Sequence, residues 1–335
     1  MQRSPRKTDI NQPNAPVSAQ VDNRASPAFG FALPSAADRR TLSTVKSRYC
    51  DITHDADTQA LWLRLKQEAP IKFTSELIED LCQVHLSVEA QLSGINSSPD
   101  GDRLRYQVFA SRIPEIFSLG GDLALFRDCI SSGDQHTLTR YAQAAVSLVH
   151  LTAQAYDHEV TTIALVQGQA LGGGFEAALA AHVIVAERSA KMAFPEVLFN
   201  MFPGMGAYQF LCRRLSRREA EQVILSGRTY TALELHALGV VDVLAEDGQG
   251  EEAVRRYIRS HARQSHARKG FRRAIDIASP LSLSTLRQIA DVWVETAMGL
   301  STRDLDTIDY LLRAQQRQSQ RIQDGLQTHP VLQKA

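Results

Sequence analysis

The 335-residue sequence has few cysteines and no cluster of metal ligands. Its four cysteines are scattered along the chain, without a Cys-x-x-Cys pair or a short-range Cys/His cluster. This distribution disfavours both a zinc site and a disulfide-stapled scaffold. We therefore expect reduced thiols, a cytoplasmic protein, and a site that uses neither a metal nor a cofactor.

The sequence also lacks net charge and long apolar runs. Lysine and arginine together number 37, as do aspartate and glutamate, so no overall basic surface attracts nucleic acid or an anionic membrane. The longest apolar run, Ala177 to Ala186, is interrupted by His182 and is well short of the roughly 18 to 20 residues of a membrane span. We expect a soluble protein with no nucleic-acid partner and no membrane span.

The patterns that are present are typical of a globular protein of the α/β class. Strand and helix signals alternate between residues 38 and 260, which we predict to be the core. Residues 1–37 are rich in Pro, Ser, Asn and Gln and predict a disordered N-terminal extension. Residues 261–330 lack strand signals and predict long polar helices that continue from the core.

The alternation predicts individual elements. Strands are expected at residues 47–52, 61–65, 105–110 and 161–167. Helices are expected at residues 125–130, 137–156, 208–215 and 217–225. A further long helix begins near Thr74, and a polar loop is expected at 93–102.

A glycine triplet follows the predicted strand at 161–167. It stands in the stretch Leu171-Gly172-Gly173-Gly174-Phe175-Glu176, which predicts a strand end, a tight turn and a helix start. The first N–H groups of a helix have no partner within the helix, and they attract a carboxylate or a developing oxyanion. This turn is therefore a candidate for binding a reacting oxygen.

A second glycine turn, Leu119-Gly120-Gly121, can point a backbone N–H into the same cleft. Two N–H groups that converge on one oxygen form an oxyanion hole, and loss of one donor typically costs ~2.7 to 4 kcal/mol of transition-state stabilisation. Such a hole suits a thioester carbonyl that becomes an enolate or a tetrahedral adduct.

Two glutamates accompany these turns. Glu196 follows Glu176 by 20 positions and stands in the segment Phe194-Pro195-Glu196. Beside an oxyanion hole, such carboxylates can remove a proton, deliver one or activate water. Two carboxylates in one cleft cannot easily both be ionised, so one acts as acid and the other as base. The residues alone leave the two roles unassigned.

Two further clusters each allow two interpretations. One is a group of flexible and aromatic side chains that is either ordinary core or an acyl-chain pocket, namely Met192, Met201, Phe202, Met205, Tyr208 and Phe210. The other is a basic run that is either a solvated helix face or a docking patch for an acidic carrier protein, namely Arg213, Arg214, Arg217 and Arg218.

Taken in order, the motifs resemble the crotonase, or enoyl-CoA hydratase/isomerase, superfamily. The resemblance spans about Leu61 to Val243 and rests on residues 117–123, 168–176, 195–197, 203–206, 225–228 and 237–242. It implies a ββα spiral fold with a helical C-terminal part, assembled as a homotrimer or a dimer of trimers. It also implies that the N–H groups of Leu119 and Gly173 form the oxyanion hole. Glu176 and Glu196 match the two acid/base glutamates of the hydratases.

Within the superfamily, the chain most resembles the synthases of diffusible signal factor, the cis-2-unsaturated fatty acids of bacterial quorum sensing. The likeness lies in residues 171–178, 194–208, 289–298 and 311–315. It implies dehydration of a 3-hydroxyacyl thioester on acyl carrier protein, and hydrolysis to the free acid in the same site. Helices within 261–330 would then trimerise and cover the pocket. The implied substrate-binding residues are Gly120, Gly172, Met201, Phe202, Gly204, Met205 and Trp293.

Two other functions compete with this one. An enoyl-CoA hydratase of fatty-acid degradation would act on acyl-CoA and release no free acid. The lack of a clear basic motif for the phosphates of CoA is consistent with a carrier-protein substrate instead. A non-catalytic homologue would bind a partner, such as a regulatory sensor-kinase domain or RNA, but the retention of both glutamates and the neutral charge argue against it.

Overall fold

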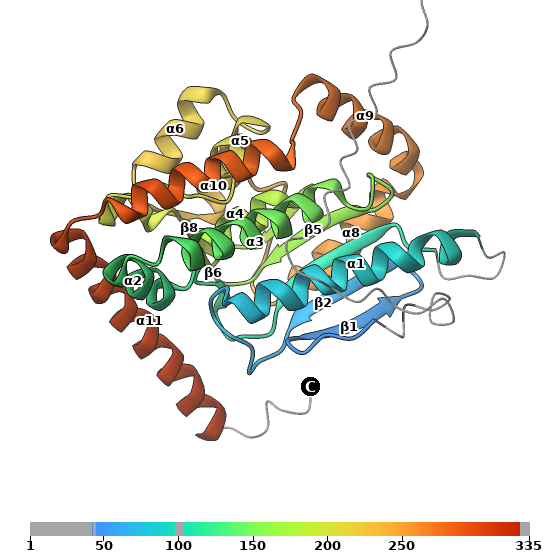
Figure 1. The fold of residues 1–335 in the computed structure, drawn as a ribbon. Helices are drawn as coiled ribbons and strands as arrows, with labels where there is room; N and C mark the ends of the chain where they lie inside the picture. The colour runs from blue at the N-terminus through green and yellow to red at the C-terminus, as the bar shows by residue number, and fades with distance from the viewer. Residues whose placement is uncertain (1–41, 43–44, 98–102, 329–335) are drawn as a thin grey trace, which may run out of the picture.

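Two β-sheets form the centre of the protein, for which a computed structural model describes residues 42, 45–97 and 103–328 (Figure 1). Within these residues, the larger sheet has six strands in the spatial order β1 (Cys50–Asp55), β2 (Ala60–Leu65), β3 (Tyr106–Ser111), β5 (Thr161–Val166), β7 (Val183–Glu187) and β10 (Val243–Ala245). The smaller sheet of the same residues has the order β4 (Ile116–Ser118), β6 (Gln169–Leu171), β8 (Lys191–Ala193) and β9 (Thr229–Thr231).

The strands pair in parallel except at two edges, where β1 is antiparallel to β2 and β9 is antiparallel to β8. Sequence composition explains why β2 and β5 lie inside the sheet and not at its edge. All six residues of β2 are buried, and β5 has the apolar run Ile163–Val166. A parallel strand that is covered on both faces needs such a continuous apolar sequence rather than an alternating one.

A repeated unit connects the two sheets. The chain passes from a strand of the larger sheet to a strand of the smaller sheet and then into a helix. This happens in β3–β4–α2 (Leu123–Ser132), β5–β6–α4 (Gly173–Ala180) and β7–β8–η3 (Pro195–Phe199), the last of which is a short 3-10 helix. The repetition confirms the predicted α/β class and the ββα spiral.

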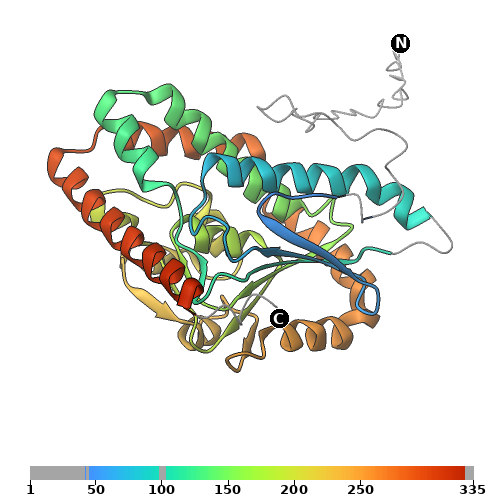
Figure 2. The same cartoon turned by 90° about the horizontal axis from the view of Figure 1, so that it is seen from below.

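Helices cover both faces of the larger sheet. In Figure 1, α1 (Ser75–Ser97) and α3 (Gln135–Gln154) lie in front of the strands and α8 (Gly250–His261) lies behind them. Figure 2 shows α1 and α3 together on one side of the sheet. Helix α3 also contacts α10 (Leu283–Met298), so α3 lies between the sheet and the C-terminal part. The remaining short helices are α5 (Ala207–Cys212), α6 (Arg217–Leu225) and α7 (Ala232–Ala237).

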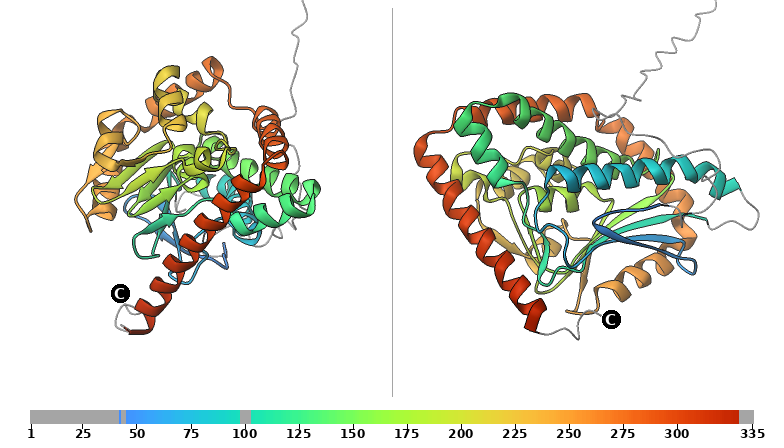
Figure 3. Two further views of the ribbon diagram at one scale, coloured as in Figure 1. Left: turned by 90° about the vertical axis from the view of Figure 1, so that its left-hand side faces the viewer. Right: turned by 60° about the horizontal axis from the view of Figure 1, so that its bottom comes forward.

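The described chain beyond His261 is helical, as predicted. It contains η4 (Ala262–Gln264), α9 (Ser265–Ala278), α10 and α11 (Thr302–Thr328). Helix α11 contacts α2 and η3, and Figure 3 shows it running along one side of the molecule and beyond the body. None of the described helices combines the length and the apolar character that crossing a bilayer requires.

The domain boundaries at 38–260 and 261–330 stay predictions, and the extension at 1–37 lies outside the described residues. One local expectation differs from the structure. The polar loop predicted to begin at residue 93 is still helical to Ser97. The apolar run Ala177 to Ala186 divides into the end of α4 and the start of β7.

Candidate active site

A cavity of about 270 Å³ lies where the smaller sheet meets the C-terminal helices. Both glycine turns and both glutamates line it, together with residues of α2, α3, α10 and α11. The cavity therefore unites the motifs that the sequence placed far apart along the chain.

The first glycine turn needs glycine at Gly172. This residue lies between β6 and α4 and has a φ of +51°, a value that side chains disfavour. A Cβ atom here would lie 2.3 Å from Oε1 of Glu196. Glycine thus permits both the turn and the close approach of the Glu196 carboxylate to the backbone.

The second turn lies directly against the first. Gly120 has a φ of +91°, and a Cβ on it would lie 2.6 Å from the carbonyl oxygen of Leu171. A Cβ on Gly173 would lie 3.6 Å from the backbone nitrogen of Gly121. Among the described residues, neither the Gly121 N–H nor the Gly173 N–H donates to a protein acceptor. Two unpaired donors therefore lie beside each other in the cavity wall.

Leu119 differs from its predicted role. Its N–H donates to the carbonyl oxygen of Ile71 at 2.7 Å, and its own carbonyl oxygen accepts from Nε2 of Gln315 at 3.1 Å. Leu119 lines the cavity, but its N–H is already satisfied. Leu119 was expected to donate its N–H to the oxyanion hole, but the unpaired N–H of this turn belongs to Gly121, two positions later.

Glu176 is buried in the first turn of α4, with 1% of its surface exposed. Its Oε1 accepts hydrogen bonds from the backbone N–H groups of Met205 at 2.7 Å and Ala207 at 3.0 Å. Burial raises the pKa of Glu176 to about 7, although these two hydrogen bonds oppose the rise by stabilising the charged form. Glu176 is thus set to exchange a proton near neutral pH.

Glu196 lies in η3, and its carboxylate has a different environment from that of Glu176. Some atoms of the residue are exposed, but the carboxylate oxygen Oε2 is buried and has no hydrogen-bond partner among the described residues. Burial raises the pKa of Glu196 well above its ordinary value, and the negative charge of Glu176 raises it further. Because Glu176 receives two backbone hydrogen bonds, the pair places its negative charge on Glu176 and keeps a proton on Glu196.

The rest of the cavity wall is mostly apolar. Trp293 of α10 packs edge-on against Phe126 of α2, with ring centroids 5.0 Å apart. Gly204 permits this arrangement, because a Cβ on it would lie 2.4 Å from Cδ1 of Trp293. Leu311 of α11 also lines the cavity. Together with Ala142 and Ala145 of α3, the apolar wall therefore comes from four helices and one glycine-containing loop.

The predicted substrate-binding residues separate into two groups. Gly120, Gly172, Gly204, Met205 and Trp293 line the cavity. Met201 and Phe202 do not: Met201 is buried in the main core and Phe202 packs against that core. Cavity residues that the sequence did not indicate include Phe126, Tyr141 and Gln318. Gln169 and Gln315 also line the cavity, and both lie in segments that were noted only for their resemblance to the family. In the described residues, no group of His, Cys, Asp and Glu side chains is arranged to hold a metal ion.

Comparison with known proteins identifies the family. The family model for Enoyl-CoA hydratase/isomerase matches residues 77–291. The peroxisomal fatty acid beta-oxidation multifunctional protein AIM1 of Arabidopsis thaliana is 34% identical over 132 residues, which are 39% of this chain but only 18% of that protein.

Solved structures share the fold at lower identity. Enoyl-CoA hydratase from Bacillus halodurans superposes with a TM-score of 0.60 at 21% identity, over 78% of this chain and 99% of that one. An enoyl-CoA hydratase from Polaromonas sp. JS666 gives 0.58 at 23% identity, over 72% and 88%. Pseudomonas aeruginosa DspI gives 0.54 at 21% identity, over 72% and 91%. With its family match and its ββα spiral, this chain belongs to the enoyl-CoA hydratase/isomerase family.

Proposed function

We propose that this protein dehydrates a 3-hydroxyacyl thioester carried by acyl carrier protein and hydrolyses the product to a free cis-2-unsaturated fatty acid, a quorum-sensing signal. The observation that carries the proposal is the pairing of Glu176 and Glu196, both with raised pKa values, in one cavity with two unpaired backbone N–H groups. This arrangement suits proton transfers at a polarised carbonyl.

In this mechanism the N–H groups of Gly121 and Gly173 donate to the thioester oxygen. They draw electron density from the carbonyl, which makes the α-proton more acidic and the carbonyl carbon more electrophilic. Their lack of a protein acceptor supports this role, because the donors are already placed and need no rearrangement when charge develops on the oxygen.

The elimination uses the single proton of the glutamate pair. The ionised carboxylate takes the α-proton, and the resulting negative charge moves to the thioester oxygen in the oxyanion hole. The C–O bond at the β-carbon then breaks, and the hydroxyl leaves as water with the proton of the other carboxyl group. One proton enters the pair and one leaves it, so the pair ends with the charge that it began with.

Hydrolysis can follow at the same carbonyl. An ionised carboxylate accepts a proton from water as the water oxygen bonds to the carbonyl carbon. The tetrahedral oxyanion occupies the same hole. Its collapse breaks the C–S bond, and the carboxyl group returns the proton to the leaving sulfur, which releases the fatty acid and the carrier thiol. The buried, raised-pKa carboxyl pair supports both steps, since each needs a group that changes protonation near pH 7.

The apolar part of the cavity supports an acyl substrate. Trp293, Phe126 and Leu311 provide aromatic and aliphatic surface next to the two turns. The choice of the signal-forming reaction over simple hydration rests on the resemblance of residues 194–208 and 289–298. A regulatory sensor-kinase partner belongs to the same proposal and rests on that resemblance alone.

The deciding experiment is a product assay with purified protein and 3-hydroxydodecanoyl acyl carrier protein, read by mass spectrometry. We expect a free acid that has lost one water, with cis geometry at C2. Interconversion of trans-2-dodecenoyl-CoA and its 3-hydroxy form without release of any free acid would instead establish a hydratase. Glu176→Gln and Glu196→Gln should each reduce product formation at least ~100-fold, and the exposed Glu221→Gln is the matched control.

A further inference from the structure

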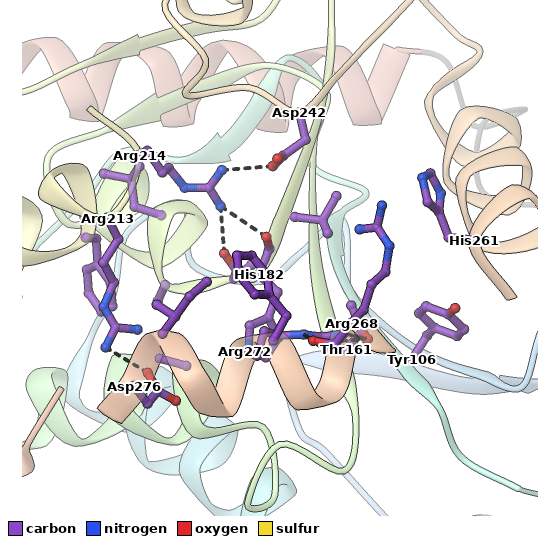
Figure 4. A pocket seen from close by; sticks show the side chains of 18 of the residues that line it. Tyr106, Thr161, His182, Arg213, Arg214, Asp242, His261, Arg268, Arg272 and Asp276 are labelled. Carbon is purple, nitrogen blue, oxygen red and sulfur yellow. Dashed lines mark hydrogen bonds and ion pairs between the residues drawn. The ribbon is translucent and has the colours of Figure 1, made fainter. Parts of the chain in front are cut away.

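A second cavity, of about 380 Å³, lies apart from the proposed active site and shares no lining residue with it. Tyr106, Thr161 and Val183, which line this second cavity, are the first residues of β3, β5 and β7. The cavity therefore lies at the amino ends of the parallel strands, with α9 passing over it (Figure 4).

Four arginines surround this cavity, and two of them are paired. Arg213 contacts Asp276 at 2.8 Å, and Arg214 contacts Asp242 at 2.9 Å. Arg214 also donates to the carbonyl oxygens of Ala181 and Val240. Both aspartates that line the cavity are thus neutralised by these two arginines.

The other two arginines, Arg268 and Arg272 of α9, have no carboxylate partner among the described residues. Arg272 donates through both terminal nitrogens to Oγ1 of Thr161 at 2.8 Å. Burial lowers the pKa of Arg272, and the neighbouring positive charge of Arg268 contributes to the decrease. Two positive charges therefore remain in the cavity wall without a counterion.

Arg268 has an unused hydrogen-bonding edge. Its Nη1 donates to the hydroxyl of Tyr257 at 3.0 Å, which leaves the edge formed by Nε and Nη2. Nε is buried and has no hydrogen-bond partner among the described residues. This edge is the planar fork that binds the two oxygens of a carboxylate. The buried Nε–H is costly without an acceptor, and an anion at this edge would supply one.

Part of the remaining wall is apolar, and His182, His261 and Ser265 add polar groups to it. Leu179, Phe210 and Ile275 line the same cavity, and Phe271 of α9 lies at it with 68% of its surface exposed. Helix α9 has no fully buried residue, so it covers a hollow instead of a packed core. The volume is within the range of about 300 to 1,000 Å³ that is usual for small-molecule sites.

We propose that this second cavity binds a medium-chain fatty acid, with the carboxylate on Arg268 and Arg272 and the chain against Leu179, Phe210 and Ile275. The site is separate from the catalytic cavity, and its occupation does not depend on the reaction that the catalytic cavity performs. It gives the enzyme a second place at which a free acyl carboxylate is recognised.

Photoaffinity labelling of the full-length protein tests this proposal. The probe is dodecanoate with a terminal diazirine, and labelled peptides are mapped by mass spectrometry after irradiation. We expect labelling in peptides containing Phe210 and Ile275, separate from any labelling near Trp293. Arg268→Gln/Arg272→Gln should reduce the labelling around Phe210 and Ile275 by at least ~10-fold, as expected for loss of a charge-assisted bidentate contact.

Two control variants test whether labelling needs the two arginines and the apolar part of the cavity. Arg273→Gln removes an exposed charge from the same helix and should leave the labelling unchanged. Ile275→Trp keeps both arginines but fills the apolar part, and it should also remove the label. Retained labelling near Trp293 in every variant reports that the protein is folded.

Absence of label at Phe210 and Ile275 in the wild type, or equal label in the double variant, overturns the proposal. Competition by inorganic phosphate, or equal labelling by the matching dodecanol probe, would also overturn it, because one shows a site for the anion alone and the other a site for the chain alone.

Discussion

At the residue scale, the two buried glutamates link activity to stability. The pKa of Glu176 is raised from 4.5 to about 7, so between these values the folded protein binds more protons than the unfolded chain. The free energy of unfolding must therefore decrease as pH rises through this window. The raised pKa that lets Glu176 exchange a proton near neutral pH thus lowers the free energy of unfolding at that pH.

Replacing Glu176 should expose this cost. Glu176→Gln keeps an oxygen that can accept from Met205 and Ala207 but cannot ionise. We expect urea unfolding at pH 8 to show a gain of about 1–3 kcal/mol over the wild type, with little gain at pH 4.5. The same variant should lose about 10²- to 10⁴-fold in kcat. Equal stability changes at both pH values would contradict the raised pKa.

The pH dependence of kcat/KM provides a second prediction for these residues. The pair must hold one proton, so activity should fall about tenfold per pH unit below pH 7, as Glu176 becomes protonated. An alkaline decrease should follow when Glu196, whose pKa is raised well above its ordinary value, loses its proton. Steady-state rates measured between pH 5 and pH 10 test both limbs. An acid limb centred near pH 4.5 would show that Glu176 is not the group that titrates.

Local sequence predicted the glycine turns and the glutamates because each motif defines its own geometry. It could not identify the unpaired N–H in the second turn. That depends on Ile71, whose carbonyl oxygen accepts the hydrogen bond from the Leu119 N–H, whereas the Gly121 N–H has no protein acceptor among the described residues. Likewise, Met201 and Phe202 are adjacent to cavity residues in sequence, but they pack in or against the core instead.

At the element scale, α11 supplies a wall of the proposed acyl site. Leu311 lines the cavity, whereas Gln316 is exposed on the same helix. Leu311→Asp places a charge beside the acyl chain and should reduce kcat/KM at least ~10-fold, because a carboxylate is costly against an apolar group. Gln316→Asp adds the same charge at an exposed position and should have no such effect. If both variants behave alike, α11 does not contact the substrate.

The contact between α10 and the loop at Gly204 gives another prediction at this scale. Gly204→Ala would place a methyl group 2.4 Å from the Trp293 ring, so the ring must move. We expect a stability loss of about 1–3 kcal/mol from overpacking and a changed acyl-length preference. Thermal unfolding and a series of acyl carrier substrates from C8 to C14 measure both effects. An unchanged length profile would mean that Trp293 does not limit the pocket.

Helices and strands were predicted best where one pattern of apolar residues, helical or strand-like, continued along the whole segment. The helix at 217–225 agrees with α6, and the strand at 161–167 agrees with β5 apart from its last residue. Strand β7 was missed because the run from Ala177 to Ala186 contains a helix end and a strand start, and a single histidine, His182, is the only polar residue between them. The position of α11 against α2 and η3 is set by tertiary packing, for which the sequence has no local signal.

At the scale of the whole molecule, exposed apolar side chains on the C-terminal helices are consistent with the expected self-association. Ile277 of α9 has 83% of its surface exposed, and Tyr310 of α11 has 60%. We predict a trimer or a dimer of trimers, which light scattering should detect as three or six times the chain mass. Ile277→Glu should weaken the assembly if α9 is at the interface. A monomeric wild-type protein would remove this expectation.

The hydrogen bond from Gln315 to Leu119 joins residues that are 196 positions apart. Translation proceeds from the N-terminus, so both glycine turns and both glutamates leave the ribosome before Trp293, Leu311 and Gln315. A nascent or prematurely terminated chain thus holds the proposed proton-transfer groups without the wall that retains an acyl chain. A chain that lacks α10 and α11 would therefore leave the proposed acyl site open, because residues of both helices line the cavity.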